Sequence, residues 1–526
     1  MAIAFGNKVA KTDHSVVVEA TCASALSKNQ RFLETLLAFV RQQFNCLPQQ
    51  KRVQNYCFFP KYARDNRFFL HDWNYFCTFA TEKETLMRKT IYILLCGLCG
   101  ILPIQAQYRT KILNSDIRTL RVQYAEHTTV QRPFLVLQDG VIDGTDPQNT
   151  LEISFDEMSH NVHFYTCTLL HLNADWTESN LSSSEYVSGF TTQDITYYEH
   201  SLNTQRDYTH YRFLFPNEEM QVLASGNYAL KIYEDGNPDK VAAYVCFPVV
   251  EPRVEMTANI RSNTSIELNG RYQQADIDIN TSGLQLRDPN EIKLVVRQNG
   301  RIDNQAVPSY PTYVEPNRLR YQNQQALIFE GGNEYRHFDA YSVYFSGTGI
   351  DQIEFDNRDY HAFLFADALR GTGAEYSGDL VTDKCGTPYM HEYDADGQYL
   401  VNAERTTDSD TEAEYLWAHW TLPAPNPWFD GAVYVGGDMF LNHFGADNRM
   451  QYDNEHRCYY LTQLVKQGGY DYQYWFVPKG GRAATLQRTE GSHWQTENEY
   501  TIYVYYHPFG GRYDQLVGCQ VVKSTK

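Results

Sequence analysis

Hydrophobic and polar residues alternate along most of the chain beyond residue 107. The clearest alternating runs lie at 151–155, 211–215, 228–232 and 241–249. Because neighbouring side chains of a strand point to opposite faces, this period of two predicts strands with one buried face. Turn pairs between such runs predict hairpins, and they lie at Asp139-Gly140, Asp235-Gly236 and Asn299-Gly300.

These runs predict an all-β fold of tandem immunoglobulin-like and E-set β-sandwich domains. Seven or eight short strands between residues 108 and 250 match the number expected of an immunoglobulin-like sandwich. Two further strand-rich stretches follow, the first of them with a predicted strand at 341–345, and a polar, charged run separates the two. The predicted domains are therefore 108–252, 253–405 and 406–526. The many Tyr, Phe, Thr and Val residues favour strands, and no long helix is predicted in this region.

A short apolar segment precedes the strand-rich region. Met87 is followed by two basic residues, an apolar run to Ile104, and then Gln105, Ala106 and Gln107. This order is typical of a secretory signal peptide at 87–106, cleaved between Ala106 and Gln107. The run of about 15 residues is shorter than the roughly 20 that a membrane-crossing helix needs, which favours a signal peptide over a membrane anchor.

Residues 1–86 precede this predicted signal. Signal peptides act at an N-terminus, so the simplest interpretation is that translation starts at Met87. Residues 1–86 would then be an upstream translated region and a non-native extension. The alternative is a real extension whose role the sequence does not indicate.

The region beyond the predicted signal is acidic. It holds 32 Lys and Arg against 57 Asp and Glu, a net charge of about −25. Nucleic-acid binding is disfavoured, because affinity for phosphates comes from basic surface. No second long apolar segment follows, so the exported protein is predicted to be soluble or peripheral to a membrane.

The cysteines do not form a recognisable framework. Five lie beyond residue 107, widely spaced, and they contain no C-x-x-C motif. Cys167 and Cys246 lie on strand-like runs. They are either two buried thiols or one disulfide bridge.

Motifs typical of enzymes are incomplete. His391-Glu392 lacks the second His of a zinc-binding H-E-x-x-H motif, and Gly371-Thr-Gly373 lacks the third Gly of a dinucleotide-binding loop. No pair of carboxylates stands out among the acidic residues. The motif searches therefore identify no catalytic, metal or cofactor site, and no small-molecule substrate is expected.

The run His171-Leu-Asn-Ala-Asp-Trp176 lies between a predicted strand and a long polar connection. Loops at the ends of sandwiches often carry binding contacts, so this run is a candidate binding loop. The alternative is structural: Asn173 and Asp175 would bond turn amides, and Trp176 would cover the core. The residue types favour the structural role.

A series of short motifs begins with this run. They are HLNADW (171–176), SGF (188–190), SLNT (201–204), YTHY (208–211), FPN (215–217) and SGNY (225–228), with further ones at 329–336, 466–474 and 494–514. In this order, the chain resembles the plug proteins of the type IX secretion system over nearly all of 108–526. One departure is Leu172, where the family usually has Cys.

The resemblance implies a non-enzymatic periplasmic protein. Such a protein binds and seals the periplasmic end of the very large outer-membrane translocon β-barrel, and is peripheral to the outer membrane through that partner. Reversible contact suggests a polar interface of charged and Tyr-rich loops. The family motif also supplies the candidate structural or contact residues: His171, Asn173, Asp175, Trp176, Gly189, Asn203, Thr204, Tyr208, Tyr211, Gly226, Asn227 and Tyr228.

An alternative function is that of a periplasmic or surface carbohydrate-binding β-sandwich protein. The region 406–526 is similar to starch-binding E-set sandwiches, in which exposed aromatic rings stack on sugars. Trp428 and Trp475 are candidates for such rings. However, Phe444 stands where that family has its stacking Trp, which makes the plug role the preferred interpretation.

Overall fold

The computed structural model describes residues 107–126, 132–370, 396–481 and 483–524. The predicted extension 1–86 and signal peptide 87–106, with Ala106, lie outside the described residues. The described part is mostly β-strand in several largely antiparallel sheets, which confirms the all-β prediction in this form. No helix within it is long and apolar enough to cross a membrane.

The helices of the described part are single turns. The α-helices are α3 (Ser183–Tyr186) and α4 (Ser409–Glu412). The 3-10 turns are η1 (Pro147–Asn149), η2 (Pro289–Glu291), η3 (Gln325–Leu327) and η6 (Asp438–Phe440). Asp side chains cap η1, η2 and α4 by accepting a backbone N–H, so these turns follow from local chemistry.

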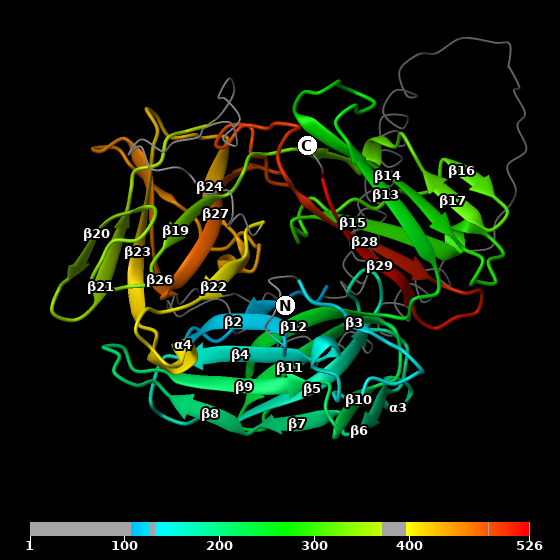
Figure 1. Cartoon of the computed structure of the whole chain (residues 1–526), viewed down its shortest axis with the longest axis horizontal. Helices are drawn as coiled ribbons and strands as arrows, with labels where there is room; N and C mark the ends of the chain where they lie inside the picture. The colour runs from blue at the N-terminus through cyan, green and yellow to red at the C-terminus, as the bar shows by residue number, and fades with distance from the viewer. Residues whose placement is uncertain (1–106, 127–131, 371–395, 482, 525–526) are drawn as a thin grey trace, which may run out of the picture. The chain divides into compact units, whose positions relative to one another are not determined.

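The first lobe, residues 107–252, has two main sheets that share one apolar core (Figure 1). The order of one sheet is β1 (Lys111–Ile112), β12 (Val241–Val250), β11 (Gly226–Glu234), β5 (Tyr165–Leu172) and β7 (Thr192–Ile195), with β3 (Leu135–Val136) parallel to β12. The order of the other is β2 (Ile117–Tyr124), β4 (Leu151–Glu157), β9 (Thr209–Phe215) and β8 (Tyr197–His200). A small pair joins β6 (Val187–Gly189) to β10 (Met220–Val222). Alternate residues such as Ile153 and Leu230 meet in the core, as their spacing predicts.

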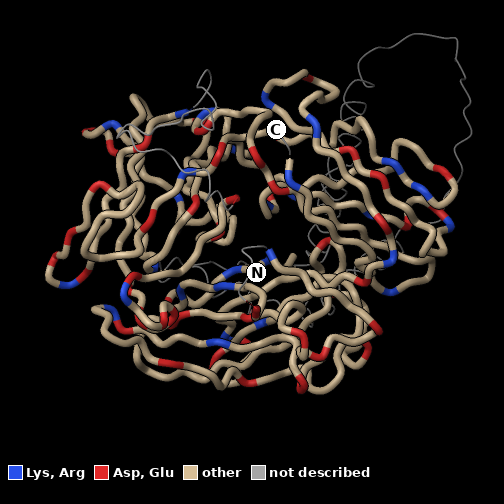
Figure 2. The backbone as a smooth tube through the Cα atoms, viewed as in Figure 1, with Lys and Arg blue, Asp and Glu red and all other residues tan. Residues whose placement is uncertain are grey.

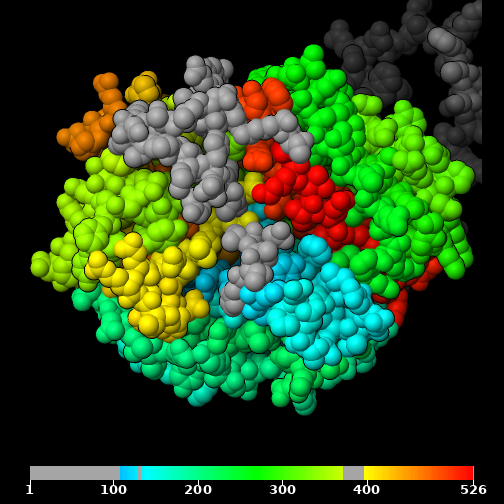
Figure 3. Space-filling model, in the orientation of Figure 1, coloured from blue at the N-terminus to red at the C-terminus, as the bar shows by residue number. Residues whose placement is uncertain are grey.

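The second lobe combines residues 253–334 with residues 496–524. Its first sheet contains β13 (Glu255–Arg261), β14 (Tyr272–Asn280), β17 (Arg318–Tyr321), β16 (Tyr313–Glu315) and β18 (Ile328–Glu330). Its second contains β15 (Ile292–Gln298), β28 (Glu499–Tyr506) and β29 (Gln515–Lys523). The two sheets share one core, which includes Ile277, Leu294 and Ile502. Figure 3 shows the C-terminal segment, in red, against the green surface of this lobe.

The third lobe comprises residues 335–495. Its first sheet contains β20 (Ile350–Phe355), β21 (Tyr360–Leu364), β23 (Tyr415–Pro423), β26 (Cys458–Lys466) and β25 (Gln451–Asp453). Around β27 (Gly468–Pro478) lie β19 (Arg336–Asp339), β22 (Tyr399–Val401) and β24 (Gly431–Gly436). Trp420 and Tyr474 are central in the shared core.

Strand pairing crosses residue 405, where a domain boundary is predicted. Residues of β15 pair with β28 from Ile292–Tyr506 to Gln298–Tyr500, about 200 positions away. In the third lobe, β21 runs parallel to β23, and β19 pairs with β27. Each of these pairs joins one strand from 253–405 to one from 406–526.

The three predicted turn pairs all adopt turn conformations, but the hairpins predicted at Asp139-Gly140 and Asn299-Gly300 do not form, because β3 pairs with β12 and β15 pairs with β28. Both residues of each predicted turn pair have positive φ, from +50° at Asn299 to +81° at Gly140. Such values are easy for Gly and tolerated by Asn and Asp. The turn at Asp235-Gly236 directly joins the paired strands β11 and β12. In contrast, the predicted strand at 341–345 is wrong, since these residues form bends.

Cys167 and Cys246 are free thiols, so they form no bridge. Burial raises the pKa of each to about 12. Both are therefore free thiols, Cys167 buried and Cys246 half-buried at the cavity, which agrees with the unbridged alternative that the sequence leaves open.

Candidate functional site

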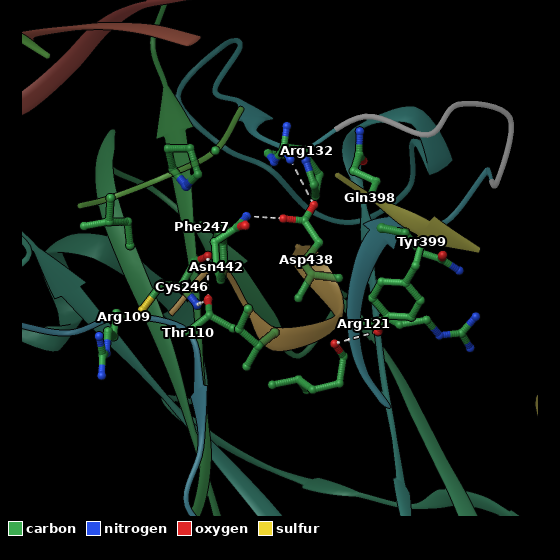
Figure 4. Close-up of a pocket in the computed structure, with 18 of the residues that line it drawn as sticks. Arg109, Thr110, Arg121, Arg132, Cys246, Phe247, Gln398, Tyr399, Asp438 and Asn442 are labelled. Carbon is green, nitrogen blue, oxygen red and sulfur yellow. Dashed lines mark hydrogen bonds and ion pairs between the residues drawn. The ribbon is translucent and has the colours of Figure 1, made fainter. Parts of the chain in front are cut away.

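The three lobes meet around a cavity of about 510 Å³ (Figure 4). The first lobe contributes Thr110 and Arg121 to its lining, the second contributes Arg297, and the third contributes Tyr399 and Asp438. Aromatic, aliphatic and charged groups therefore face one space. Side chains from different lobes contact one another around this cavity, and these contacts hold the lobes together.

One wall of the cavity is a strained turn of the third lobe. Leu441 and Asn442 follow η6 with φ values of +52° and +49°. Two consecutive non-glycine residues in the left-handed region are unfavourable, so neighbouring contacts must hold them there. Leu441 packs against the core of the first lobe, and the Asn442 amide donates to Asp438. The turn therefore joins the third lobe to the first.

Arg132 connects this turn to the second lobe. Its guanidinium donates to Asp438 at 3.1 Å and to Glu499 at 3.0 Å. It also donates to the carbonyl oxygen of Asp396 at 2.9 Å. Burial raises the pKa of Asp438, although the ion pair with Arg132 opposes this shift. One arginine of the first lobe therefore binds groups from both of the others.

A second buried cluster joins the first lobe to the third. Asp156 on β4 accepts from Lys466 on β26 at 2.6 Å and from the Tyr415 hydroxyl at 2.7 Å. The ring Nδ1 of His210 lies 2.6 Å from the same carboxylate. Burial disfavours the charged carboxylate, but Lys466 and His210 outweigh it and lower the pKa of Asp156 to about 2. The carboxylate is therefore held as an anion inside the protein.

Further contacts extend this cluster. Arg121 pairs with Asp410, whose carbonyl oxygen also accepts from Lys466 at 2.6 Å. The Lys466 ammonium lies 4.2 Å from the ring centroid of Tyr208, and the Tyr208 hydroxyl donates to the carbonyl oxygen of Ala413 at 2.8 Å. Tyr208, a family-motif residue, therefore lies between the lobes.

The run 171–176 lies at the junction of the first and second lobes. His171 is buried, with Nδ1 at 2.8 Å from the Ser179 hydroxyl and Nε2 at 3.1 Å from the carbonyl oxygen of Ser225. Its ring packs edge-to-face on Tyr228 and Tyr513. Burial lowers the pKa of His171 to about 4, so the imidazole is neutral near pH 7.

Asn173 and Asn227 complete this junction. The amide of Asn227 donates to the carbonyl oxygen of Asn173 at 2.8 Å and accepts from the Tyr505 hydroxyl at 2.9 Å. The backbone N–H of Ala174 donates to Asp514 in the loop between β28 and β29 at 3.0 Å. The motif thus binds the C-terminal hairpin of the second lobe.

Asp175 and Trp176 shape the turn itself. Asp175 accepts from the backbone and hydroxyl of Thr177 at 3.1 and 2.6 Å. Trp176 has a φ of +64°, and its ring lies 5.3 Å from the guanidinium of Arg297. The Asp175 bonds are of the kind that the structural alternative expects, whereas the Asn173 side chain bonds the carbonyl oxygen of Glu178 and the backbone N–H of Asp514. The Trp ring, however, lies at the cavity rather than over the core of the first lobe.

The remaining motif residues hold loops and core of the first lobe. The Tyr211 hydroxyl donates to His163 at 2.9 Å, and the Tyr228 hydroxyl donates to Ala224 at 2.8 Å. Thr204 donates to Ser201 at 2.9 Å. Positive φ values occur at three positions, which are Gly189, Asn203 and Gly226.

Sequence reasoning missed the charged groups that join the lobes. Asp156 alternates with the apolar residues of β4, so it reads as a solvent-facing position. Its burial depends on Lys466, which is 310 residues away. One local sign is Lys466, a basic residue just before the motif GGYDYQYW at 468–475. The sequence does not show that Asp156 is its partner.

Two kinds of binding site were sought among the described residues. No group of three or more His, Cys, Asp or Glu there could hold a metal ion. Trp475, one candidate sugar-stacking residue, is fully buried and packs against Ala484 and Leu486, so it offers no exposed face. Trp428 is half-buried and remains accessible.

Comparisons with known proteins agree with the family resemblance seen in the sequence. Residues 117–251 match the family model "Type 9 secretion system plug protein 1st domain". A hypothetical protein from Parabacteroides merdae, solved by crystallography, is 35% identical, with a TM-score of 0.73. The alignment covers 80% of this chain and 100% of that one. No curated protein matches the chain.

Proposed function

The chain belongs to the type IX secretion system plug protein family, and from this premise we propose that it is a periplasmic plug. It would bind the periplasmic end of the outer-membrane translocon β-barrel and seal it when no substrate crosses. The observation that carries the proposal is the family match over 117–251 in the first lobe, which contains most of the family motifs.

The junctions between lobes support this role physically. A plug must keep its shape against a large aqueous opening. Buried polar contacts connect the lobes at Arg132, Lys466 and the run 171–176. Separating the lobes would break these hydrogen bonds, which costs free energy. We infer that the lobes act as one rigid body in the seal.

We also propose how the lobes correspond to domains. Each pair of sheets around one core would be an immunoglobulin-like or E-set sandwich. The second domain would consist of residues 253–334 completed by 496–524, with residues 335–495 inserted between them. The first would remain 108–252, as predicted from the sequence.

The expected contact with the barrel is polar. Figure 2 shows acidic and basic residues spread over the loops of all three lobes. Such a surface suits a reversible interface better than a large apolar one does. We propose that binding, without catalysis or a cofactor, is the whole function, and that it places the protein at the periplasmic face of the outer membrane.

Affinity purification from detergent-solubilised outer membranes tests the proposal. A tagged full-length chain should recover a very large β-barrel protein, and deleting the gene should make cells permeable to large polar solutes. Complementation with the wild-type gene should restore the barrier. Recovery of other translocon components without the barrel, or unchanged permeability on deletion, would contradict the proposal.

A further inference from the structure

We propose that a groove on the third lobe binds an oligosaccharide that carries carboxylate groups. The groove has a volume of about 610 Å³ and lies between β24, β25 and the segment 443–450. Its lining is unusually aromatic, and the rings are those of Trp428, Tyr434, Phe444, Tyr452 and Tyr459. This inference does not rest on the proposed plug function, because the groove is described by its own contacts.

The walls of the groove are fixed. The Tyr459 hydroxyl accepts from the backbone N–H of Trp428 at 2.6 Å, and the Tyr452 hydroxyl donates to Ala424 at 2.9 Å. On the other side, the buried Asn448 amide donates to Val435 and to His443 at 2.9 and 2.6 Å. The ring of Phe444 is held edge-to-face by Trp475. A preformed site loses little entropy when a ligand binds.

Space in the groove comes from small residues. Gly431, Ala432, Gly445 and Ala446 line it among the rings. At Gly431, a Cβ would meet the Phe476 ring at 2.4 Å, so a larger residue would displace Phe476, which packs edge-to-face on Trp428 behind the groove. The groove is therefore open between the aromatic rings because glycine and alanine occupy these positions.

The polar groups in the lining are mostly unused donors. Within the described part of the chain, the Trp428 indole N–H and the Arg449 guanidinium have no hydrogen-bond partner, and Gln451 uses only its oxygen, which accepts from Tyr460. Indole and guanidinium groups donate and do not accept. The ligand should therefore be rich in acceptors and negatively charged near Arg449.

An acidic sugar chain fits these groups better than a peptide does. Sugar rings stack on aromatic faces through their C–H groups and present many oxygen acceptors, and carboxylates pair with guanidinium. A peptide could add to the edge of β24, but that edge already bonds at Val433 and Val435 to Met450 and Asn448. The guanidinium of Arg449 would pair with a sugar carboxylate, so the groove should bind acidic sugars more tightly than neutral ones.

Calorimetric titration of the purified full chain tests the inference. The probes are hexasaccharides of galacturonic acid, glucose and N-acetylglucosamine. The galacturonic acid chain should bind about tenfold more tightly than the neutral two, which corresponds to one charge-assisted hydrogen bond. The variant Arg449→Gln should remove this difference, and Trp428→Ala should weaken all binding about tenfold or more.

The matched control is Phe429→Ala. Phe429 neighbours Trp428 and is 79% exposed, but it does not line the groove, so its removal should leave binding unchanged. Arg449 is exposed, so its variant tests the site even if Trp428→Ala fails to fold. Absence of binding to any hexasaccharide at millimolar concentration would overturn the inference. So would binding that both variants retain, or hexaglutamate binding as tightly as the galacturonic acid chain.

Discussion

Lys466 and Asp156 join the third lobe to the first through an ion pair of 2.6 Å in which each side chain is 1% exposed. A charged pair buried this completely has lost its water, so each member depends on the other. Both strands that carry them, β4 and β26, also supply apolar residues to separate cores. The pair therefore marks a fixed junction between lobes.

Replacing Lys466 by Met should destabilise the protein strongly. It would leave the Asp156 carboxylate buried with no ammonium partner, and breaking one side of a buried pair typically costs about 3–5 kcal/mol. Urea denaturation, followed by tryptophan fluorescence, measures the change. The control is Lys240→Met, which removes an exposed pair with Asp235 and should leave the midpoint unchanged. Equal stability of wild type and Lys466→Met would show that the pair does not hold the lobes.

Asp156 should make the protein sensitive to strong acid. Its pKa is about 2 in the folded state and 3.8 as the ordinary value. A folded pKa below the unfolded one means that the stabilisation is present above pH 3.8 and is lost as the pH falls toward 2, by about 2 kcal/mol. The free energy of unfolding, measured between pH 5 and 2, should fall less in Asp156→Asn. An identical slope in both proteins would contradict this assignment.

His171 should make stability depend on pH at higher pH values than Asp156 does. Burial lowers its folded pKa to about 4 from the ordinary 6.5, so the unfolded chain binds the proton more readily. Stability should therefore decrease as the pH falls from 6.5 to 4, by about 3 kcal/mol. The variant His171→Gln should make this part of the stability curve shallower but not flat, because burial also lowers the pKa of His419 to about 4. Replacing the exposed His456 by Gln should preserve the slope, and an unchanged slope in His171→Gln would locate the titration elsewhere.

Gly226 is a position where only glycine fits. Its φ is +143°, and an added Cβ would lie 2.6 Å from Nε2 of His171. Gly226→Ala should therefore destabilise the protein by about 2–4 kcal/mol, since it combines backbone strain with a clash at the junction. The matched control, Gly236→Ala, has positive φ but open space around it, and should cost about 1 kcal/mol. Thermal unfolding compares the two, and an equal effect would exclude the His171 contact as the cause.

The sequence predicted the parts of this fold that depend on local chemistry. The alternation in β4 and β11 identified which residues face the core, and Asp235-Gly236 identified a hairpin, because both signals lie within a few residues. The strand predicted at 341–345 is absent. Tyr344 and Phe345 are instead exposed on bends, where neither cross-strand neighbours nor a core fix them.

The junctions could not be predicted, because they depend on residues far apart in the chain. In β4, Glu152, Ser154 and Asp156 occupy the polar positions of an alternating strand, yet all three are buried. The sequence shows that polar and apolar residues alternate in β4. It does not show that the third lobe covers the polar face of this strand. The motif run 171–176 was found through family resemblance, whereas Asp514, which bonds Asn173 and Ala174, lies 340 or more residues away.

Removing the C-terminal strands should unfold the second lobe rather than the third. Ending the chain after residue 497 deletes β28 and β29 and takes Tyr500, Ile502 and Val504 out of the core that β14 shares. Deleting several such side chains, at about 2–5 kcal/mol each, exceeds the stability of a typical domain. Hydrogen exchange should then show loss of protection in β14, with Trp420 and its neighbours in the third lobe less affected.

The matched control ends the chain after Ser524, which retains both strands and the bond from the Ser524 backbone to Asn498. Its exchange pattern should equal that of the full chain. If the chain were organised as 253–405 and 406–526, ending it after residue 497 would instead expose β23 and β26 while β14 kept its protection. The two arrangements therefore predict opposite exchange patterns, because the same two strands complete a different core in each.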